Sequence, residues 1–312
     1  MPKILISDVL SNLANEVFER NNIEVDTQTD LTPNELKDII NQYDGLVVRS
    51  ATKATDEIIS AGSKLKIIGR AGAGVDNIDL DSAKKNNVIV MNTPGGNTNA
   101  TAEHTLSLLL SLYRSIPDAS YGTHQGLWEK KKFKGLELKG KKIGLIGFGN
   151  VAKRVTELVK GFDMEIVVYS KSFSSIKDQF PDIKSLSLEE IITSCDIISF
   201  HCKPTDNGNS LINLNELNKM KKSAVIINTA RGNLVNEEDL KEALENSMIR
   251  GAALDVFSKE PAKENILFGT KNLILTPHIA ASTEEAQIVV AKQIAEQISD
   301  YFITGKIVNS VS

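Results

Sequence analysis

His278 stands in a sequence pattern suited to acid–base chemistry. It follows a short apolar run in Thr276-Pro277-His278-Ile279, so we expect it at the end of a strand. Reduction of a carbonyl group needs a proton donor near neutral pH, and histidine is the usual one. Of the four histidines, we expect His104 to be packed inside a long helix, His124 to face solvent and His201 to contact a cofactor. His278 is the best candidate for the acid–base group.

Two further strand ends supply what such a histidine needs. Arg231 lies on a tight turn before Gly232, where its guanidinium could hold the carboxylate of a 2-keto acid in bidentate fashion. Two acids, Asp255 and Glu260, follow another apolar run, and one of them should pair with His278 and favour its protonated form. Taken singly, each of these charged residues could form an ordinary surface ion pair. Because all of them follow strands of the same sheet, an active site is the favoured interpretation.

The segment 147–152 resembles a dinucleotide-binding loop, because it follows an apolar strand and opens a helix. Gly147 would permit the tight turn, and Gly149 would let the backbone approach a pyrophosphate at the helix N-terminus. Ala152 is a small residue at the third position, where the helix packs on the sheet. A dinucleotide cofactor is therefore expected.

The choice between NAD(H) and NADP(H) stays open. About 20 residues after the loop, a carboxylate usually binds the ribose hydroxyls of NAD. This chain has Ser170 there, followed by Lys171. Serine with a neighbouring ammonium group could accept a 2′-phosphate, or Lys171 could simply point to water. We also expect cofactor contacts from five further residues, namely Asn150, Val151, Cys202, Thr229 and Asp255.

Near the N-terminus, Arg49-Ser50 and the segment Gly69 to Asp76 also come directly after apolar runs. The second segment contains Gly72 and Gly74, which expose backbone N–H groups. Together with arginine side chains, these groups predict an anion site. The alternative is a pair of ordinary glycine-bearing turns.

The elements that must position these residues form two alternating α/β series. We predict strands at 3–6, 23–25, 45–48, 65–68 and 88–91 in the first series, and at 142–146, 165–169, 196–200, 224–228, 251–254 and 272–275 in the second. A long helix is predicted over 98–115 and another over 284–302. Six strands with intervening helices are typical of a complete doubly wound nucleotide-binding sheet. Two parallel-sheet domains are expected.

Composition narrows the classes of partner. The 312 residues carry 36 Lys+Arg and 40 Asp+Glu, a net charge of -4, so no global positive field favours nucleic acid or an anionic membrane. The apolar stretches are far shorter than the ~18 residues that a membrane-spanning helix needs. Two cysteines, Cys195 and Cys202, fit neither a metal site nor a disulfide framework. We expect a cytoplasmic protein without a metal.

These motifs resemble the D-isomer-specific 2-hydroxyacid dehydrogenases, and most closely the group that acts on D-3-phosphoglycerate. The similarity extends over nearly the whole chain through the segments 48–53, 69–79, 90–97, 101–105, 128–140, 228–232, 253–261 and 277–283. It implies a flavodoxin-like substrate domain (1–96 and 284–312), a Rossmann cofactor domain (97–283) and a homodimer built around 98–135. It also implies catalysis by Arg231, Glu260 and His278, with substrate binding by Arg49, Ser50, Gly72 and Gly74.

The chain departs from the family pattern mainly at the cofactor site. Asn150 replaces a common arginine, Ala152 a third glycine and Ser170 an aspartate, while Lys130 stands where an arginine is frequent. The chain stops at Ser312, so we expect it to lack the serine-sensing regulatory domain of longer relatives. These departures lie in the cofactor site, whereas the residues that match the family's catalytic positions are all present.

The resemblance implies oxidation of 3-phosphoglycerate to 3-phosphohydroxypyruvate, the first committed step of serine biosynthesis. One alternative is an NADPH-dependent glyoxylate or hydroxypyruvate reductase, which Ser170 and Lys171 would suit. Another is a dinucleotide-sensing binding protein on the same fold. A sensor need not keep Arg231, Glu260 and His278, so their presence favours an enzyme.

Overall fold

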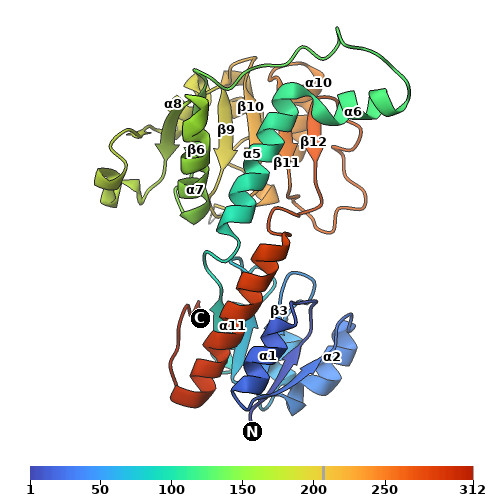
Figure 1. Ribbon diagram of the computed structural model, residues 1–312, viewed down its shortest axis with the longest axis vertical. Coiled ribbons are helices and arrows are strands. Elements are labelled where there is room, and N and C mark those ends of the chain that lie inside the picture. The colour runs from blue at the N-terminus through green and yellow to red at the C-terminus, as the bar shows by residue number, and fades with distance from the viewer. Residues whose placement is uncertain (206–207, 312) are drawn as a thin grey trace. The chain divides into compact units, whose positions relative to one another are not determined.

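A parallel sheet forms the centre of each of the two units into which the chain divides. The computed structural model describes residues 1–205 and 208–311 (Figure 1). One unit comprises Met1–Asn97 and Ala281–Ser312, and the other comprises Thr98–Ala280. Among the residues described, no helix is long and apolar enough to cross a membrane.

The first unit has a five-stranded parallel sheet of order β2-β1-β3-β4-β5, which is the flavodoxin-like order. Its strands are β1 (Lys3–Ile6), β2 (Glu24–Thr27), β3 (Gly45–Val48), β4 (Ile67–Arg70) and β5 (Ile89–Asn92). Strand β4 begins two residues later than expected. The reason is that the N–H of Leu65 is used in a turn, donating to the Gly62 carbonyl at 2.9 Å.

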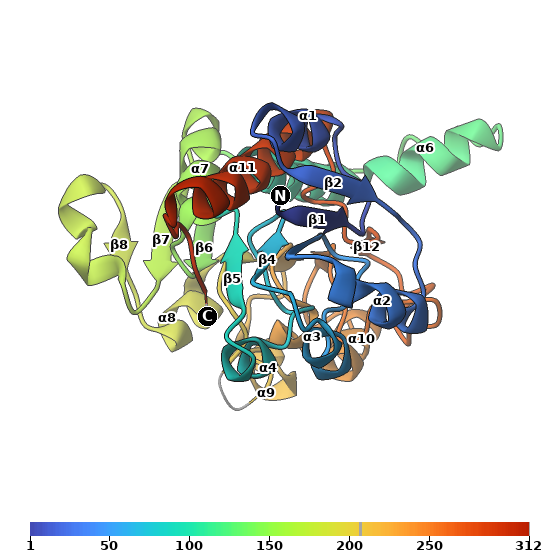
Figure 2. The ribbon, with the colours of Figure 1, turned by 90° about the horizontal axis from the view of Figure 1, so that it is seen from below.

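Helices cover both faces of this sheet (Figure 2). Apolar side chains of α1 (Leu13–Arg20) and α11 (Glu284–Thr304) pack in one buried cluster with β1, β3 and β4. Those of α2 (Pro33–Ile39), α3 (Asp56–Ala61) and α4 (Leu80–Lys85), with the short helix η1 (Ile40–Gln42), pack in another. The expected α/β layering of this unit is confirmed.

The second unit has a seven-stranded parallel sheet of order β12-β11-β10-β9-β6-β7-β8, the Rossmann order with one added strand. Six strands fall where they were expected: β6 (Lys142–Ile146), β7 (Glu165–Tyr169), β9 (Ile197–Phe200), β10 (Val225–Asn228), β11 (Gly251–Leu254) and β12 (Leu273–Leu275). The seventh, β8 (Lys184–Ser185), was not predicted. It is a two-residue edge strand of two exposed polar residues, so it leaves no apolar pattern in the sequence.

Helices again cover both faces. Helices α5 (Thr98–Arg114) and α7 (Asn150–Val159) pack on one face, and α8 (Leu188–Ser194), α9 (Leu214–Lys219) and α10 (Glu237–Glu245) on the other. Short 3₁₀ turns complete the unit: η2 (Lys160–Phe162), η3 (Phe173–Ser175), η4 (Lys177–Gln179) and η5 (Gly232–Leu234). Burial of both faces explains why the strands are nearly continuous apolar runs.

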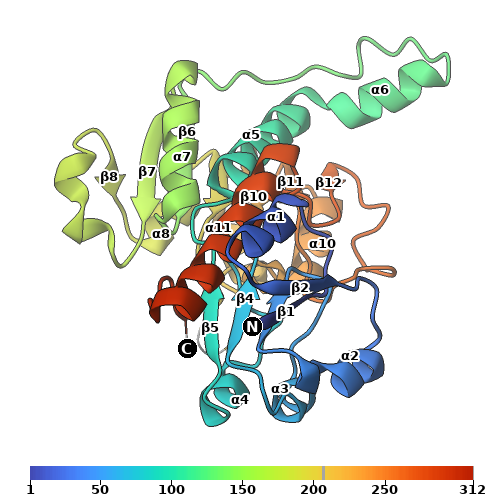
Figure 3. The same ribbon diagram turned by 60° about the horizontal axis from the view of Figure 1, so that its bottom comes forward.

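Helix α5 ends at Arg114 because Ser115 adopts a left-handed conformation (φ +50°). A separate helix, α6 (Ile116–His124), follows. Figure 3 shows α6 and the extended segment after it reaching away from the sheet of their unit. Trp128 in this segment is 85% exposed. We call residues 116–135 the arm.

Each sheet has one position where the strand order reverses direction. It lies between β1 and β3 in the first unit and between β6 and β9 in the second. Ligands of open α/β sheets bind outside the carboxyl ends of the strands at such positions. The segments after β1 and β3, and after β6 and β9, are thus where binding residues should be sought.

Candidate active site

His278 and Glu260 form a close pair in the second unit. Nδ1 of His278 lies 2.6 Å from Oε2 of Glu260. His278 follows β12 in a left-handed conformation (φ +53°), and its N–H donates to the Asp255 carbonyl at 2.8 Å. Oε1 of Glu260 accepts from the N–H of Phe257 at 2.9 Å. Both carboxylate oxygens are therefore engaged, and one of them fixes the imidazole.

The electrostatics of the pair favour a protonated imidazole. The hydrogen bond to Glu260 raises the pKa of His278, against a smaller opposing effect of burial. Burial acts to raise the pKa of Glu260, but the hydrogen bonds from His278 and from the Phe257 N–H outweigh it and hold that pKa below its ordinary value. A histidine in this setting suits proton transfer near neutral pH.

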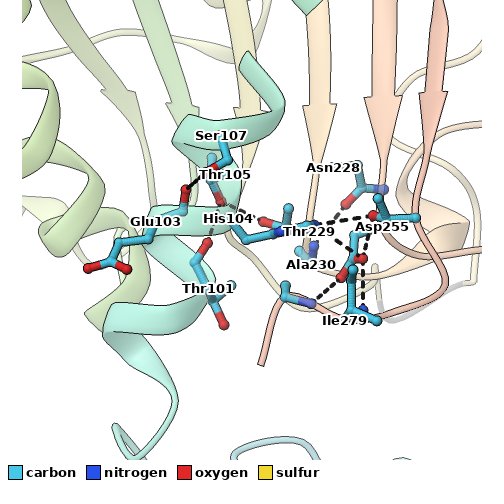
Figure 4. Close-up of polar contacts among 12 residues, drawn as sticks. Thr101, Glu103, His104, Thr105, Ser107, Asn228, Thr229, Ala230, Asp255 and Ile279 are labelled. Atoms are coloured by element: carbon cyan, nitrogen blue, oxygen red, sulfur yellow. Dashed lines mark hydrogen bonds and ion pairs between the residues drawn. The ribbon is translucent and has the colours of Figure 1, made fainter. Parts of the chain in front are cut away.

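Asp255 has a different set of partners (Figure 4). Its side chain is fully buried, and Oδ1 accepts from the Thr276 hydroxyl at 2.6 Å and from the Ile279 N–H at 2.9 Å. Oδ2 accepts from the Ala280 N–H at 2.8 Å. Nε2 of His104 lies 3.4 Å from Oδ1. Although burial acts to raise the pKa of Asp255, these hydrogen bonds hold it low.

Of the two acids that the sequence left open as partners of His278, the structure thus pairs Glu260 with it. Asp255 instead holds the backbone N–H groups of His278 and of the two residues that follow it. His104 was expected to be a packed helix residue, and the structure gives it polar contacts to Asp255 and to Thr276, the latter at 3.2 Å. No local sequence pattern signals this contact, because His104 is distant in the chain from Asp255 and Thr276.

Arg231 lies on a turn whose backbone is held by the side-chain amide of Asn228, which both donates and accepts a hydrogen bond. Nδ2 of Asn228 donates to the Arg231 carbonyl at 2.8 Å, and Oδ1 accepts from the Ala230 N–H at 3.0 Å. Nη1 of Arg231 donates to the Ala230 carbonyl at 2.7 Å. Asn228 is fully buried at the end of β10, and sequence reasoning gave it no role.

Gly232 lets this turn meet the segment that carries Glu260. A Cβ at position 232 would lie 1.8 Å from the carbonyl carbon of Phe257 and 2.4 Å from the nitrogen of Ser258. Both are backbone atoms, so no rotamer change could relieve the overlap. Glycine at this position therefore allows the close approach of the turn that carries Arg231 to residues 257–260, which we call the acid loop.

The segment after β6 has the geometry of a dinucleotide loop. Gly147 has φ +92°, and a Cβ there would lie 2.5 Å from the His201 carbonyl oxygen. Open space surrounds the Cβ position of Gly149, the N-cap of α7, which makes no side-chain capping bond. The first N–H groups of α7 thus lie beside a space that a pyrophosphate could fill.

An aromatic cluster anchors this loop. Phe148 packs edge-on against Phe173 and Phe180, with centroids 5.0 Å apart in each pair. Ala152 is fully buried, as expected for a helix packed closely on its sheet. Asn150 is exposed and Val151 is half-buried at the start of α7. Residues of these types fit a bound dinucleotide.

Ser170 directly follows β7 and offers no carboxylate, and its hydroxyl lies 3.3 Å from that of Ser172. Lys171 is exposed. After β9, Nε2 of His201 lies 2.9 Å from the Ser199 hydroxyl, and burial lowers the pKa of His201 to about 4. A neutral His201 cannot act as an acid near neutral pH.

The other expected cofactor residues occupy neighbouring strand ends of the same unit. Burial raises the pKa of the Cys202 thiol to about 11, so it is uncharged at neutral pH. The Thr229 hydroxyl, after β10, lies 2.9 Å from that of Thr105 on α5. Together with Gly147, these residues line the carboxyl ends of β6, β9 and β10.

The first unit holds the predicted anion residues at its own strand ends. Asp8, buried after β1, accepts from the N–H of Arg49 and from both the N–H (3.0 Å) and hydroxyl (2.8 Å) of Thr52. Nη1 of Arg49 donates to the Val9 carbonyl at 3.2 Å, and Ser50 is exposed. Asp8 thus shapes the loop after β3. Its position after the first strand was a signal that sequence reasoning did not use.

Gly72 and Gly74 lie in the loop after β4. Gly72 has φ +147°, and a Cβ there would lie 1.5 Å from Nη1 of Arg70, so the guanidinium covers this glycine. Arg70 is the last residue of β4 and pairs with Val48, the last residue of β3. Arg49 directly follows Val48, so the two arginines lie at the same end of adjacent strands. This arrangement suits an anionic group.

Comparison with known proteins gives consistent results. The profile "D-isomer specific 2-hydroxyacid dehydrogenase, NAD binding domain" matches residues 106–280. D-3-phosphoglycerate dehydrogenase of Synechocystis sp. is 42% identical over 97% of this chain and 54% of its own length. The chain spans about half the length of these curated relatives.

Two solved structures match along nearly their whole length. NAD⁺-bound 3-phosphoglycerate dehydrogenase of Entamoeba histolytica is 30% identical, with a TM-score of 0.84, covering 100% of this chain and 98% of the other. An acyclic imino acid reductase (Bsp5), in complex with NADPH and D-Arg, is 31% identical, with a TM-score of 0.87, covering 99% and 100%.

Proposed function

Because the chain belongs to the D-isomer specific 2-hydroxyacid dehydrogenase family, we propose that it interconverts a D-2-hydroxy acid and its 2-keto acid with a nicotinamide cofactor. The substrate pair is 3-phosphoglycerate and 3-phosphohydroxypyruvate. The observation that carries the proposal is the 2.6 Å contact between His278 and Glu260. A binding protein that only senses dinucleotides has no need of this proton-transfer pair.

The residues divide the work of the reaction. Nδ1 of His278 is engaged by Glu260, so Nε2 is the nitrogen that exchanges a proton with the substrate oxygen. In oxidation His278 takes the hydroxyl proton, and Glu260 stabilises the imidazolium that results. The guanidinium of Arg231 holds the carboxylate and polarises the neighbouring carbonyl. When bound, the nicotinamide supplies the hydride acceptor or donor.

Either nicotinamide dinucleotide fits the chain. Gly147, Gly149 and the first turn of α7 would hold the pyrophosphate, with Asn150, Val151, Thr229 and further strand-end residues beside it. The Entamoeba relative is described with NAD⁺ and the imino acid reductase with NADPH. Ser170 presents no carboxylate to repel a 2′-phosphate, which supports use of NADP(H) as well as NAD(H).

The phosphate of the substrate is assigned to the first unit. Arg49, Ser50 and the backbone around Gly72 and Gly74 form a set of donors suited to it. Glyoxylate and hydroxypyruvate, which lack a phosphate, would not need that set. Reduction of these smaller acids with NADPH is the second candidate, favoured by Ser170 with Lys171.

A homodimer is proposed from the arm. Tyr121 is 71% exposed and Leu127 51%, beside the highly exposed Trp128. Such apolar residues on a projecting segment are typical of an interface. The same unit has a cavity of about 360 Å³ with a mixed lining, in which Leu112 and Leu273 lie beside Asp118 and Arg250. Free cysteines support the cytoplasm as its location.

A steady-state panel tests this function. Phosphohydroxypyruvate, hydroxypyruvate and glyoxylate are each offered with NADH and with NADPH, and His278→Ala serves as the control. We expect the highest kcat/KM with phosphohydroxypyruvate and a loss of about 10²- to 10⁴-fold in the variant. Higher kcat/KM with glyoxylate would favour the second candidate. Absence of turnover with all three acids would contradict both.

A further inference from the structure

Two adjacent residues of α5 bond to the two strand-end segments that carry the candidate catalytic groups (Figure 4). Nε2 of His104 lies 3.2 Å from the Thr276 hydroxyl and 3.4 Å from Oδ1 of Asp255. Oγ1 of Thr105 lies 2.9 Å from that of Thr229, two residues before Arg231. One helix therefore contacts both segments through polar side chains.

The directions of these hydrogen bonds follow from proton counting. The single hydroxyl proton of Thr276 is donated to Oδ1 of Asp255 at 2.6 Å, so Thr276 can only accept from His104. Nε2 of His104 must then carry a proton and donate it, shared between the hydroxyl and the carboxylate. Similarly, Thr105 donates to the Thr101 carbonyl at 2.8 Å and accepts from Thr229.

Asp255 in turn holds the backbone around His278. Its carbonyl accepts the N–H of His278 at 2.8 Å, and its carboxylate accepts those of Ile279 and Ala280 at 2.9 and 2.8 Å. The left-handed conformation of His278 is uncommon for a residue with a side chain and persists only where its surroundings impose it. These three bonds, together with that from the His278 N–H to the Thr276 carbonyl at 3.0 Å, hold the segment in this conformation.

We propose that His104 is a positioning residue for His278. Its Nε2–H fixes Thr276 and the carboxylate of Asp255, and through them the backbone conformation that directs the imidazole of His278 onto Glu260. The inference rests on the proposed function, in which His278 transfers the proton.

The experiment compares two substitutions of the donor. Glutamine can place an amide N–H close to the position of Nε2, whereas leucine fills similar space without a donor. The readout is the pKa of His278, followed by NMR of ¹³C-labelled imidazoles in the whole protein. The four histidines give four signals, and His278→Ala identifies the relevant one. The charged groups acting on His278 are Glu260, Asp255 and Arg231.

We expect His104→Leu to lower the pKa of His278, because the imidazole no longer meets Glu260 in a fixed geometry, and His104→Gln to leave it near the parent value. An unchanged pKa in the leucine variant would overturn the proposal. An equal fall in both variants would also overturn it, since histidine would then be required for its shape. Ser107→Ala is the matched control, because the Ser107 hydroxyl donates to the Glu103 carbonyl within the same helix.

Thr276→Val provides a second test should the leucine variant fail to fold. It removes the hydroxyl between His104 and Asp255, and we expect the same fall in the pKa of His278; an unchanged pKa would overturn the proposal. In turnover, His104→Leu should lower kcat about 10- to 100-fold with little change in KM, and His104→Gln should restore most of it. If the parent turns over none of the keto acids, the proposed function fails, while the titration still decides the role of His104.

Discussion

Oε2 of Glu260 contacts Nδ1 of His278, the imidazole nitrogen opposite the one assigned to the substrate. The carboxylate thus acts on the proton affinity of the ring without occupying the reaction position. The backbone N–H of Phe257 donates to the other carboxylate oxygen, Oε1. Rotation of the Glu260 carboxylate away from the imidazole would therefore break two hydrogen bonds.

Glu260→Gln should move the pH profile. The raised pKa of His278 depends chiefly on the Glu260 hydrogen bond, so the neutral amide should lower that pKa. Keto-acid reduction needs the protonated imidazole and is lost as pH rises through its pKa. In the variant this loss should occur at a lower pH, measured as kcat/KM against pH. Glu264→Gln, an exposed change in the same loop, is the control, and coincident profiles for parent and Glu260→Gln would exclude Glu260 as the partner.

Gly232→Ala should impair catalysis by moving the acid loop. The new Cβ would overlap the Phe257 and Ser258 backbone, so the loop must shift and carry Glu260 with it. We expect kcat to fall about 100-fold, with a stability loss of about 1–3 kcal/mol measured by denaturant unfolding. Gly161→Ala is the matched control, because open space surrounds its Cβ position. A fully active Gly232→Ala protein would show that the close approach has no role in catalysis.

Arg49→Ala tests the assignment of the substrate phosphate. A charge-assisted hydrogen bond contributes about 1.5–3 kcal/mol, which corresponds to roughly 10- to 150-fold in affinity. We therefore expect KM for phosphohydroxypyruvate to rise by about that factor, with a much smaller change for hydroxypyruvate. The second substrate is the internal control for folding. Equal increases in KM for both substrates would indicate that Arg49 binds the carboxylate of the substrate and not its phosphate.

Ser170→Asp tests the choice of cofactor. The carboxylate would accept hydrogen bonds from the ribose hydroxyls of NADH and repel the 2′-phosphate of NADPH. We expect kcat/KM to rise with NADH and to fall with NADPH, the latter by roughly 10- to 150-fold if Lys171 contributes a charge-assisted contact. Lys171→Ala should weaken the binding of NADPH and leave the binding of NADH unchanged. If the parent already fails to use NADPH, Lys171 is solvated and Ser170 has no bearing on the phosphate.

Sequence patterns predicted the sheets well because buried parallel strands are short apolar runs. They did not predict β8, whose residues Lys184 and Ser185 are polar and exposed. The limits of β4 were also displaced, since Leu65 is apolar but serves in a turn. The apolar pattern of a sequence indicates which residues are buried. It indicates which residues pair in a sheet only where the paired residues are also the buried ones.

Within the candidate site, the sequence identified the residue types but not all of their contacts. Strand ends alone did not decide between Asp255 and Glu260, because the choice depends on how residues 257–260 turn back, and only the family resemblance pointed to Glu260. The approach of Gly232 to Phe257 and that of His104 to Asp255 are contacts between distant segments. Such contacts depend on topology, which local pattern does not encode.

The arm has one optical consequence. The chain contains a single tryptophan, Trp128, and 85% of its surface is exposed. Intrinsic indole emission from this protein therefore reports on the arm alone. If two copies assemble through it, the emission maximum should shift to the blue as protein concentration rises, and the midpoint of that shift gives the dissociation constant of the dimer without any added label.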